Sequence, residues 1–205
     1  KKASSYARLG SGSAARSIYG GLVSWGKVDQ EDNSSDNHSV CRSSEVPREM
    51  LNVCDAIVIV SAGEKKVSST KGHQLMDGHE YRDIRISNAK SRYKKLIEAM
   101  KNRDFKVWGE IIEQEALELH ALMMTSKESY MLMEPQTISV INTVREYREK
   151  YNVPLYFTLD AGPNVHLLYP SKFSEEVESF LKSNLVGHEI IFDCVGSGPK
   201  KWEND

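Results

Sequence analysis

The chain has 205 residues and a mass of 23.2 kDa, and 40% of its residues are hydrophobic, enough for one large domain or two small ones with a packed core. It carries 27 Lys and Arg against 29 Asp and Glu, so no overall basic field predicts nucleic acid or a membrane surface as a partner. No apolar run approaches the roughly 20 residues that cross a bilayer, and the sequence opens with neither a signal-peptide core nor a methionine. We therefore expect the later part of a longer protein.

Cysteine and histidine usage predicts no metal site. Cys41, Cys54 and Cys194 are odd in number, widely separated and without Cys-x-x-Cys spacing, which argues against a disulfide framework or a structural zinc site. The six histidines lack the spacing of a metal-binding helix, so we interpret them as structural or surface residues. A reducing compartment is the default expectation, which places the protein in the cytoplasm.

The first candidate site is the glycine- and serine-rich stretch 9–21, "LGSGSAARSIYGG". Residues 1–28 contain five cations and no carboxylate, so this neighbourhood is locally positive. Glycines let backbone N–H groups approach an anion, serines add donors, and the Arg16 guanidinium can bind a carboxylate or phosphate in a bidentate manner. The spacing matches neither common phosphate motif, and a flexible linker is the alternative. The candidate residues are Gly10, Ser11, Gly12, Ser13, Ala14, Ala15 and Arg16.

Three segments follow with distinct predictions. Residues 19–28 are predicted to form a strand entered through a glycine pair. Residues 29–39 form a polar stretch that we expect to be a loop too hydrophilic to pack. Residues 52–63 contain a short apolar run rich in β-branched residues and ending at glycine, which predicts a buried strand.

The next region is predicted to be helical. Ser68, Ser69 and Thr70 gather hydroxyls before a helix start, a pattern that ordinary capping explains. The second helix is predicted to begin at Asp104 as its N-cap. Apolar residues recur at helical spacing in three groups: Ala89, Tyr93, Leu96, Ile97 and Met100; then Trp108, Ile111, Ile112, Leu119, Leu122 and Met123; then Ile138, Ile141, Val144 and Tyr151.

The last third predicts two strands around a turn, a helix over 174–185 and a closing strand at 189–196. Asp160 stands where the first of these strands breaks into "AGPN". A carboxylate at a strand end is well placed to take a proton from a substrate hydroxyl, although an aspartate that initiates the turn would look the same. Strands separated by amphipathic helices predict an α+β or α/β fold.

Three segments together resemble a known family. Residues 7–25 "ARLGSGSAARSIYGGLVSW", residues 67–76 "VSSTKGHQLM" and residues 156–169 "YFTLDAGPNVHLLY" closely resemble mevalonate diphosphate decarboxylases of the GHMP kinase superfamily in wording, order and spacing. The resemblance extends to 196–200 and so covers nearly the whole chain. It departs at Ala15, where the family often has cysteine, and along 29–39.

The resemblance implies a fold and a division of the chain. It implies an α+β, two-domain GHMP kinase-like architecture, with residues 1–48 the end of a ribosomal-S5-like ATP-binding domain and residues 49–205 the C-terminal α/β sandwich domain. The family chain is about twice as long as this one. Its first half supplies part of the ATP site and the contacts to the substrate diphosphate, so we expect this chain alone to be inactive.

The resemblance also implies chemistry and partners. It implies ATP-dependent decarboxylation of mevalonate 5-diphosphate to isopentenyl diphosphate in isoprenoid and sterol biosynthesis, with ATP and Mg²⁺ and in a homodimer. Asp160 would accept the proton of the C3 hydroxyl, and Arg16 would bind the substrate carboxylate. Residues 10–15 would hold phosphate oxygens, and Thr70 would make a further contact. The alternatives are a related kinase acting at C3 or on a monophosphate, and a non-catalytic anion-binding or dimerisation module.

Overall fold

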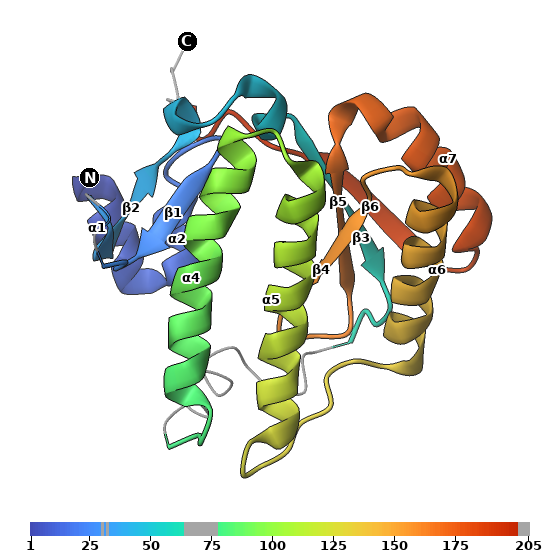
Figure 1. The fold of residues 1–205 in the computed structure, drawn as a ribbon, viewed down its shortest axis with the longest axis horizontal. Coiled ribbons are helices and arrows are strands. Elements are labelled where there is room, and N and C mark those ends of the chain that lie inside the picture. The colour runs from blue at the N-terminus through green and yellow to red at the C-terminus, as the bar shows by residue number, and fades with distance from the viewer. Residues whose placement is uncertain (30, 32, 64–77, 201–205) are drawn as a thin grey trace. The chain divides into compact units, whose positions relative to one another are not determined.

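The computed structural model describes residues 1–29, 31, 33–63 and 78–200. The described chain divides into two compact units, one made of residues 1–52 and the segment from 195 onward, the other of residues 53–194. Helices and strands are both present in the order expected of an α+β fold (Figure 1). None of the helices in the described part of the chain is long and apolar enough to cross a membrane.

The first unit is built from two short helices and a two-stranded antiparallel sheet. Gly21 donates its N–H to the carbonyl of Gly196, which joins the returning segment to this unit. A 3₁₀ turn, η1, follows the sheet, and Arg42 at its start is buried and paired with Glu31 and Glu45. The bounds are α1 Lys2–Gly10, α2 Gly12–Arg16, β1 Val23–Gly26, β2 Ser35–Cys41, η1 Ser43–Glu45 and a second 3₁₀ turn, η2, Arg48–Leu51.

The prediction of a loop over 29–39 is wrong for its second half, which forms most of β2. β2 pairs antiparallel with β1. The polar side chains are accommodated because hydrogen bonds satisfy them: the Ser34 hydroxyl donates to the Val28 carbonyl, and the buried Ser39 bonds the Ser4 hydroxyl at 2.8 Å. The hydrophilic part of the strand, residues 35–39, therefore packs without apolar side chains of its own.

The second unit is a four-stranded antiparallel sheet with helices packed against it. The strand order is β4-β5-β3-β6, so β3 is central and β4 is an edge. Its elements are β3 Val53–Ile59, α4 Arg82–Lys101, α5 Phe105–Thr125, α6 Pro135–Tyr151, β4 Tyr156–Leu159, β5 Val165–Pro170, the 3₁₀ turn η3 Ser171–Phe173, α7 Ser174–Asn184 and β6 Glu189–Cys194. The strands and helices predicted from the sequence within residues 53–63 and 78–194 are confirmed, with shifts at the ends, whereas the helix start predicted after Thr70 lies outside the described residues.

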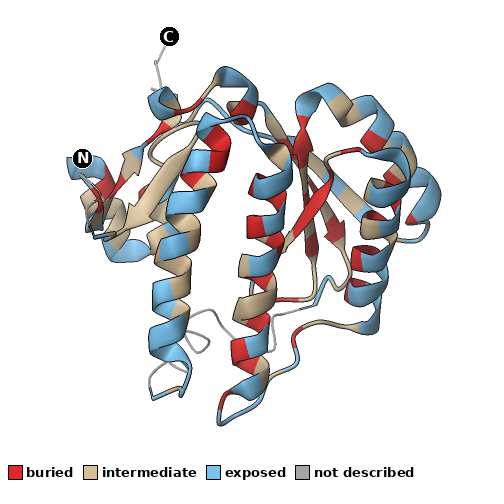
Figure 2. Cartoon of the chain, viewed as in Figure 1, coloured by how far each residue is buried: buried red, intermediate tan, exposed pale blue. Residues whose placement is uncertain are grey.

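The core of the second unit lies between one face of the sheet and the helices α6 and α7. Alternate residues of β3, Cys54, Ala56 and Val58, are buried, as the period of two in a strand requires (Figure 2). They belong to one apolar cluster with residues of β5, α6 and α7, among them Leu167, Val144 and Leu181. This cluster fixes the positions from which β4 and β5 extend to the loop between them.

Helices α4 and α5 run side by side, and α5 lies along the edge strand β4 (Figure 1). Asp104 caps α5 as predicted, accepting the N–H of Val107 at 3.0 Å. Buried Glu113 of α5 accepts the N–H of Phe157 on the edge strand and pairs with Arg148 of α6 at 2.6 Å. Two arginines of α4, Arg85 and Arg92, pair with glutamates of α5.

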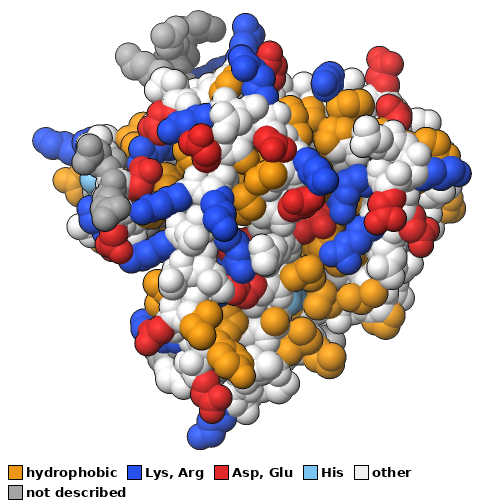
Figure 3. Space-filling model, in the orientation of Figure 1, with side chains coloured by type: hydrophobic (Ala, Val, Ile, Leu, Met, Phe, Trp, Pro, Cys, Tyr) orange, Lys and Arg blue, Asp and Glu red, His pale blue; other side chains and the backbone are white. Residues whose placement is uncertain are grey.

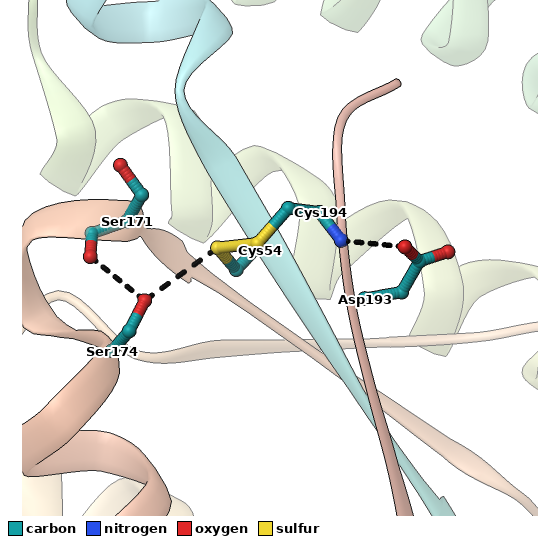
Figure 4. The surroundings of a disulfide bond; sticks show 5 residues. All are labelled: Cys54, Ser171, Ser174, Asp193 and Cys194. Atoms are coloured by element: carbon teal, nitrogen blue, oxygen red, sulfur yellow. Dashed lines mark hydrogen bonds between the residues drawn. A yellow bond between two sulfur atoms is a disulfide. The ribbon is translucent and has the colours of Figure 1, made fainter.

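The cysteines contradict the expectation that they form no disulfide. Cys54 of β3 and Cys194 of β6 are directly opposite in the antiparallel register and are bonded (Figure 4). Ser174 lies within 3.6 Å of the Cys54 sulfur and donates to the carbonyl of Ser171. Cys41 is exposed and free.

Candidate functional site

The glycine- and serine-rich stretch of the first unit contains the end of α1 and the short helix α2. Ser11 separates α1 from α2, and its hydroxyl accepts the N–H of Ala14 at 3.0 Å as the N-cap. The same hydroxyl lies 3.0 Å from the hydroxyl of Ser13. The turn forms because Ser11 caps it and the alanines after it favour helix. Both hydroxyls are exposed, so they can still turn toward an anion.

Arg16 ends this turn beside a second cation and an aromatic ring. The guanidinium carbons of Arg8 and Arg16 lie 4.7 Å and 6.0 Å from the centre of the Trp25 ring. Gly12 lies flat against the same ring, and a Cβ at this position would overlap it. The Trp25 ring is itself fixed, because its Nε1–H donates to the carbonyl of Asp36 at 2.9 Å. The Trp25 ring thus has two guanidinium groups beside it, Arg16 exposed and Arg8 half-buried, and this local positive charge favours an anionic ligand.

Ala15 lies below the surface of this turn. Its side chain is fully buried, and its carbonyl accepts the hydroxyl of Ser4 at 2.9 Å and also the hydroxyl of Ser39. The helical turn is thereby attached to α1 and β2. In this structure Ala15 fixes the position of its neighbour Arg16, and the exposed members of the predicted set in this stretch are Gly10, Ser11, Ser13 and Arg16.

Asp160 lies at the end of β4 in the second unit, at the mouth of a small cavity. The cavity has a volume of about 90 Å³. It is too small for a nucleotide or a substrate by itself, since ligand pockets usually hold roughly 300–1,000 Å³. It is lined by the Asp160–Asn164 loop, Met131, Leu132 and Glu134, and by Ser61 and Gly63 after β3.

The loop that carries Asp160 is held at three points. His120 of α5 has its Nε2 atom 3.0 Å from the Asp160 carbonyl, and buried Thr137 of α6 donates its hydroxyl to the Pro163 carbonyl at 2.7 Å. The Asn164 side-chain oxygen accepts the N–H groups of Val60 and Ser61 at 2.9 Å and 3.0 Å. These bonds come from three different elements, so the carboxylate of Asp160 is presented by a rigid backbone.

His120 is the buried titratable group of this site. Burial lowers the pKa of its imidazole, although the carbonyl and the charge of Asp160 act in the opposite direction. The imidazole is therefore neutral near pH 7. In the described part of the chain, His, Cys, Asp and Glu side chains form no group of three that could hold a metal ion.

The predicted site residues fall in both units. Gly10 to Arg16 lie in the first unit and Asp160 in the second. That Arg16 and Asp160 bind the same substrate stays a prediction. Thr70 lies outside the described residues.

Comparison with known proteins decides the family. The family model of the mevalonate 5-diphosphate decarboxylase C-terminal domain matches residues 56–201, and that of the diphosphomevalonate decarboxylase-like N-terminal domain matches residues 1–39. The first match alone covers more than half of the chain. The chain belongs to the mevalonate diphosphate decarboxylase family.

Individual relatives agree with this assignment and show how much of them the chain spans. It is 31% identical over 195 residues to a diphosphomevalonate decarboxylase of Danio rerio, which covers 92% of this chain and 48% of the relative. A phosphomevalonate decarboxylase of Haloferax volcanii is 28% identical over 93% of this chain and 53% of its own length. The chain therefore spans about half the length of these relatives.

A solved structure supports the fold of this family member directly. The structure described as MDDEF in complex with MVAPP, AMPPCP and magnesium has a TM-score of 0.82 at 30% identity, over 97% of this chain and 59% of that one. The predicted α+β fold with an N-terminal segment and a C-terminal domain is thus confirmed for this decarboxylase family member.

Sequence reasoning missed the residues that hold the Asp160 loop. His120 and Thr137 reach the loop from 40 and 26 residues away, and both bond to backbone carbonyls, which leave no trace in local sequence. Asn164 lies within residues 156–169, one of the segments that resemble the family, and directly precedes a predicted strand. Its position after Gly-Pro in a turn is the one signal that favoured a structural role.

Proposed function

We propose that this chain is the C-terminal half of an enzyme that decarboxylates mevalonate 5-diphosphate with ATP, giving isopentenyl diphosphate, carbon dioxide, ADP and phosphate. The observation that carries the proposal is Asp160, placed at a strand end on a loop that three separate elements hold in place. Membership of the decarboxylase family supports the choice of substrate. The division we propose is 1–48 for the end of the ATP-binding domain and 49–205 for the C-terminal domain.

In the first step, Asp160 accepts the proton of the C3 hydroxyl. As the hydroxyl oxygen attacks the γ-phosphorus of ATP, the O–H bond breaks toward the carboxylate, and the bond from phosphorus to the ADP oxygen breaks. A carboxylate is far too weak a base to ionise an alcohol beforehand, so the proton moves late, as the new O–P bond forms. Mg²⁺ bound to the ATP phosphates would neutralise their negative charge.

In the second step, the phosphorylated oxygen leaves C3. The C3–O bond breaks with its electron pair going to phosphate, and the bond from C2 to the carboxylate breaks to form the C2–C3 double bond and carbon dioxide. Arg16 binds the carboxylate in two hydrogen bonds and fixes the geometry for this elimination. Ser11 and Ser13, with the backbone of residues 10–14, hold phosphate oxygens, and Thr70 adds a contact.

The proposal is tested in the complete enzyme, which we take to be this chain joined to the N-terminal half found in proteins of its family. We expect Asp160→Asn to abolish release of carbon dioxide from mevalonate 5-diphosphate while ATP still binds, because the amide cannot take the proton. Asp83→Asn is the matched control, since Asp83 is a surface aspartate of α4 with a 96% exposed side chain. Product formation by Asp160→Asn close to that of wild type would remove Asp160 from the mechanism.

Arg16→Lys tests the binding of the carboxylate. An ammonium lacks the planar, two-pronged geometry of a guanidinium, so we expect kcat/KM for mevalonate 5-diphosphate to fall about 10- to 100-fold, the cost of a lost charged hydrogen bond. Arg8→Lys is the control, because Arg8 makes the same kind of contact with the Trp25 ring but has no proposed substrate contact. Unchanged steady-state kinetics for Arg16→Lys would count against this role.

A second candidate function is decarboxylation of the monophosphate. The 28% identity to a phosphomevalonate decarboxylase favours it. Product analysis with substrates carrying one or two phosphates separates the two enzymes, and it also detects a kinase that phosphorylates C3 without decarboxylation. A nucleotide titration without any signal would favour a non-catalytic module.

We further propose a homodimer in the cytoplasm, acting in the mevalonate pathway of isoprenoid and sterol biosynthesis. The cytoplasmic location follows from the proposed pathway, since the bonded Cys54 and Cys194 remove the argument from cysteine usage. On the face seen in Figure 3, cations and carboxylates are interspersed, which supports a small-molecule substrate over nucleic acid.

A further inference from the structure

His120 is a buried histidine that the proposed reaction does not use. It lies on α5 and is 1% exposed, among the most deeply buried polar residues described. A polar side chain is buried at this depth only when a partner compensates its lost hydration. The partner is the backbone carbonyl of Asp160, 3.0 Å from Nε2.

The chemistry of this contact fixes the state of the imidazole. A carbonyl oxygen only accepts hydrogen bonds, so Nε2 must carry the proton and donate it. Burial lowers the pKa of His120, which keeps the ring neutral with its single proton on Nε2. His120 is thus a fixed hydrogen-bond donor, and its donating nitrogen is occupied by the protein's own backbone.

His120 contacts Asp160, the residue of this loop that we propose as the proton acceptor. The Asp160 carbonyl accepts two donors, Nε2–H of His120 and the N–H of Gly162 at 2.8 Å. Thr137 and Asn164 hold the far end of the loop, at Pro163 and at the chain after β3. His120 attaches the peptide of Asp160 itself to α5, and the position of that peptide helps to set the direction of the Asp160 side chain.

We infer that His120 is a positioning residue that orients the Asp160 carboxylate toward the substrate hydroxyl by donating Nε2–H to the Asp160 carbonyl. This role rests on the proposed function of Asp160 as proton acceptor. It predicts an effect on the chemical step rather than on binding, because His120 contacts neither substrate in the proposed mechanism. Displacement of a reacting group by about 1 Å can cost on the order of 100-fold in rate.

The test compares His120→Leu with His120→Gln in the complete enzyme. Leucine fills the space without a donor, whereas glutamine places an N–H donor near the position of Nε2. We expect His120→Leu to lower kcat about 10- to 100-fold with KM for ATP and mevalonate 5-diphosphate within about twofold of wild type. We expect His120→Gln to recover most of the loss in kcat.

His79 supplies the matched control. Its Nε2 lies 3.2 Å from the carbonyl of Leu122 and 3.3 Å from the hydroxyl of Thr125, both on α5 and outside the Asp160 loop. His79→Leu and His79→Gln therefore remove and replace the same kind of bond elsewhere. We expect neither to give a loss of kcat that the glutamine variant restores.

The outcomes separate this inference from the proposed function. If the wild-type enzyme releases no carbon dioxide from mevalonate 5-diphosphate, the proposed function is wrong. If the wild type is active and a folded His120→Leu variant is equally active, only the positioning role is wrong. A further measurement covers the case in which His120→Leu does not fold. Long-range ¹H–¹⁵N NMR of wild type identifies the protonated ring nitrogen, where Nε2–H supports the inference and Nδ1–H overturns it.

Discussion

The burial of His120 couples the stability of the second unit to pH. The imidazole has almost no exposed surface, and burial lowers its pKa below the usual value of about 6.5. In the unfolded chain the ring titrates near that usual value, so the unfolded state binds the proton more readily. The neutral ring therefore contributes stability that is present above about pH 6.5 and is lost as pH falls from there through the lower pKa of the folded state.

Replacing His120 with glutamine should remove this dependence. We expect the free energy of unfolding of wild type to fall relative to that of His120→Gln as pH decreases below 6.5, by at most about 1.4 kcal/mol per pH unit, the limit for one proton. Urea unfolding of both proteins at pH 7.5, 6.5 and 5.5 measures it. A difference between the two proteins that stays constant across this range would contradict the prediction.

For single residues, the sequence predicts which residues are candidates for the site better than it predicts which residues contact them. Asp160 and Arg16 could be selected because their neighbours, glycine and proline in one case and glycine and serine in the other, form recognisable segments. His120 could not, because its partner is a backbone carbonyl 40 residues away. Ala15 was grouped with its neighbours, yet it is fully buried and its carbonyl accepts the hydroxyls of Ser4 and Ser39, which only the folded first unit brings together.

Helix α5 can lie close to the edge strand β4 because Gly109 stands where the two meet. A Cβ at Gly109 would overlap the ring of Tyr156, and the neighbouring Trp108 meets the same ring edge-on with centroids 6.1 Å apart. Burial raises the pKa of the Tyr156 hydroxyl, so the ring remains neutral in this contact. The glycine therefore sets the separation of the helix that carries His120 from the strand that ends at Asp160.

Gly109→Ala should destabilise the protein, although alanine favours helix more than glycine does. The gain in helix propensity is about 1 kcal/mol, while overpacking a buried contact costs about 1–3 kcal/mol and here must move a ring or the whole helix. We expect a net loss of about 1 kcal/mol in urea unfolding. Glu110→Ala is the control at the next position, where the exposed side chain should change stability by no more than about 0.5 kcal/mol. A more stable Gly109→Ala would show that the contact relaxes freely.

At the scale of whole helices and strands, the prediction succeeded where the apolar pattern was clear. It failed where hydrogen bonds between polar side chains, and not apolar packing, stabilise the element. The helices α4 to α7 and the strands β3 to β6 follow from repeating apolar positions. β2 does not, because serines and their hydroxyl bonds stabilise it. Not all the apolar positions that indicate α6 are buried, since Ile138 and Tyr151 are 43% and 54% exposed.

At the scale of the whole molecule, the disulfide spans the second unit. Cys54 is the second residue of that unit and Cys194 the last, and they are separated by 140 residues in sequence. Three cysteines allow three possible pairs, and the observed one depends on β6 lying next to β3 in register, which composition and spacing do not reveal. The bond therefore closes the entire second unit into one loop, holding together the two strands by which the chain enters and leaves it (Figure 4).

Breaking this loop should destabilise the second unit in particular. Joining residues so far apart restricts the unfolded chain, and losing such a bond typically costs about 2–4 kcal/mol. We expect Cys194→Ala to lower the free energy of unfolding by this amount and to make it insensitive to dithiothreitol, whereas wild type should lose stability when the reductant is added. Cys41→Ala is the matched control, since Cys41 is exposed and unbonded and its loss should leave the response to dithiothreitol unchanged. If wild type and Cys194→Ala unfold at the same urea concentration with and without reductant, the bond does not stabilise the unit, and the sheet alone holds β6 beside β3.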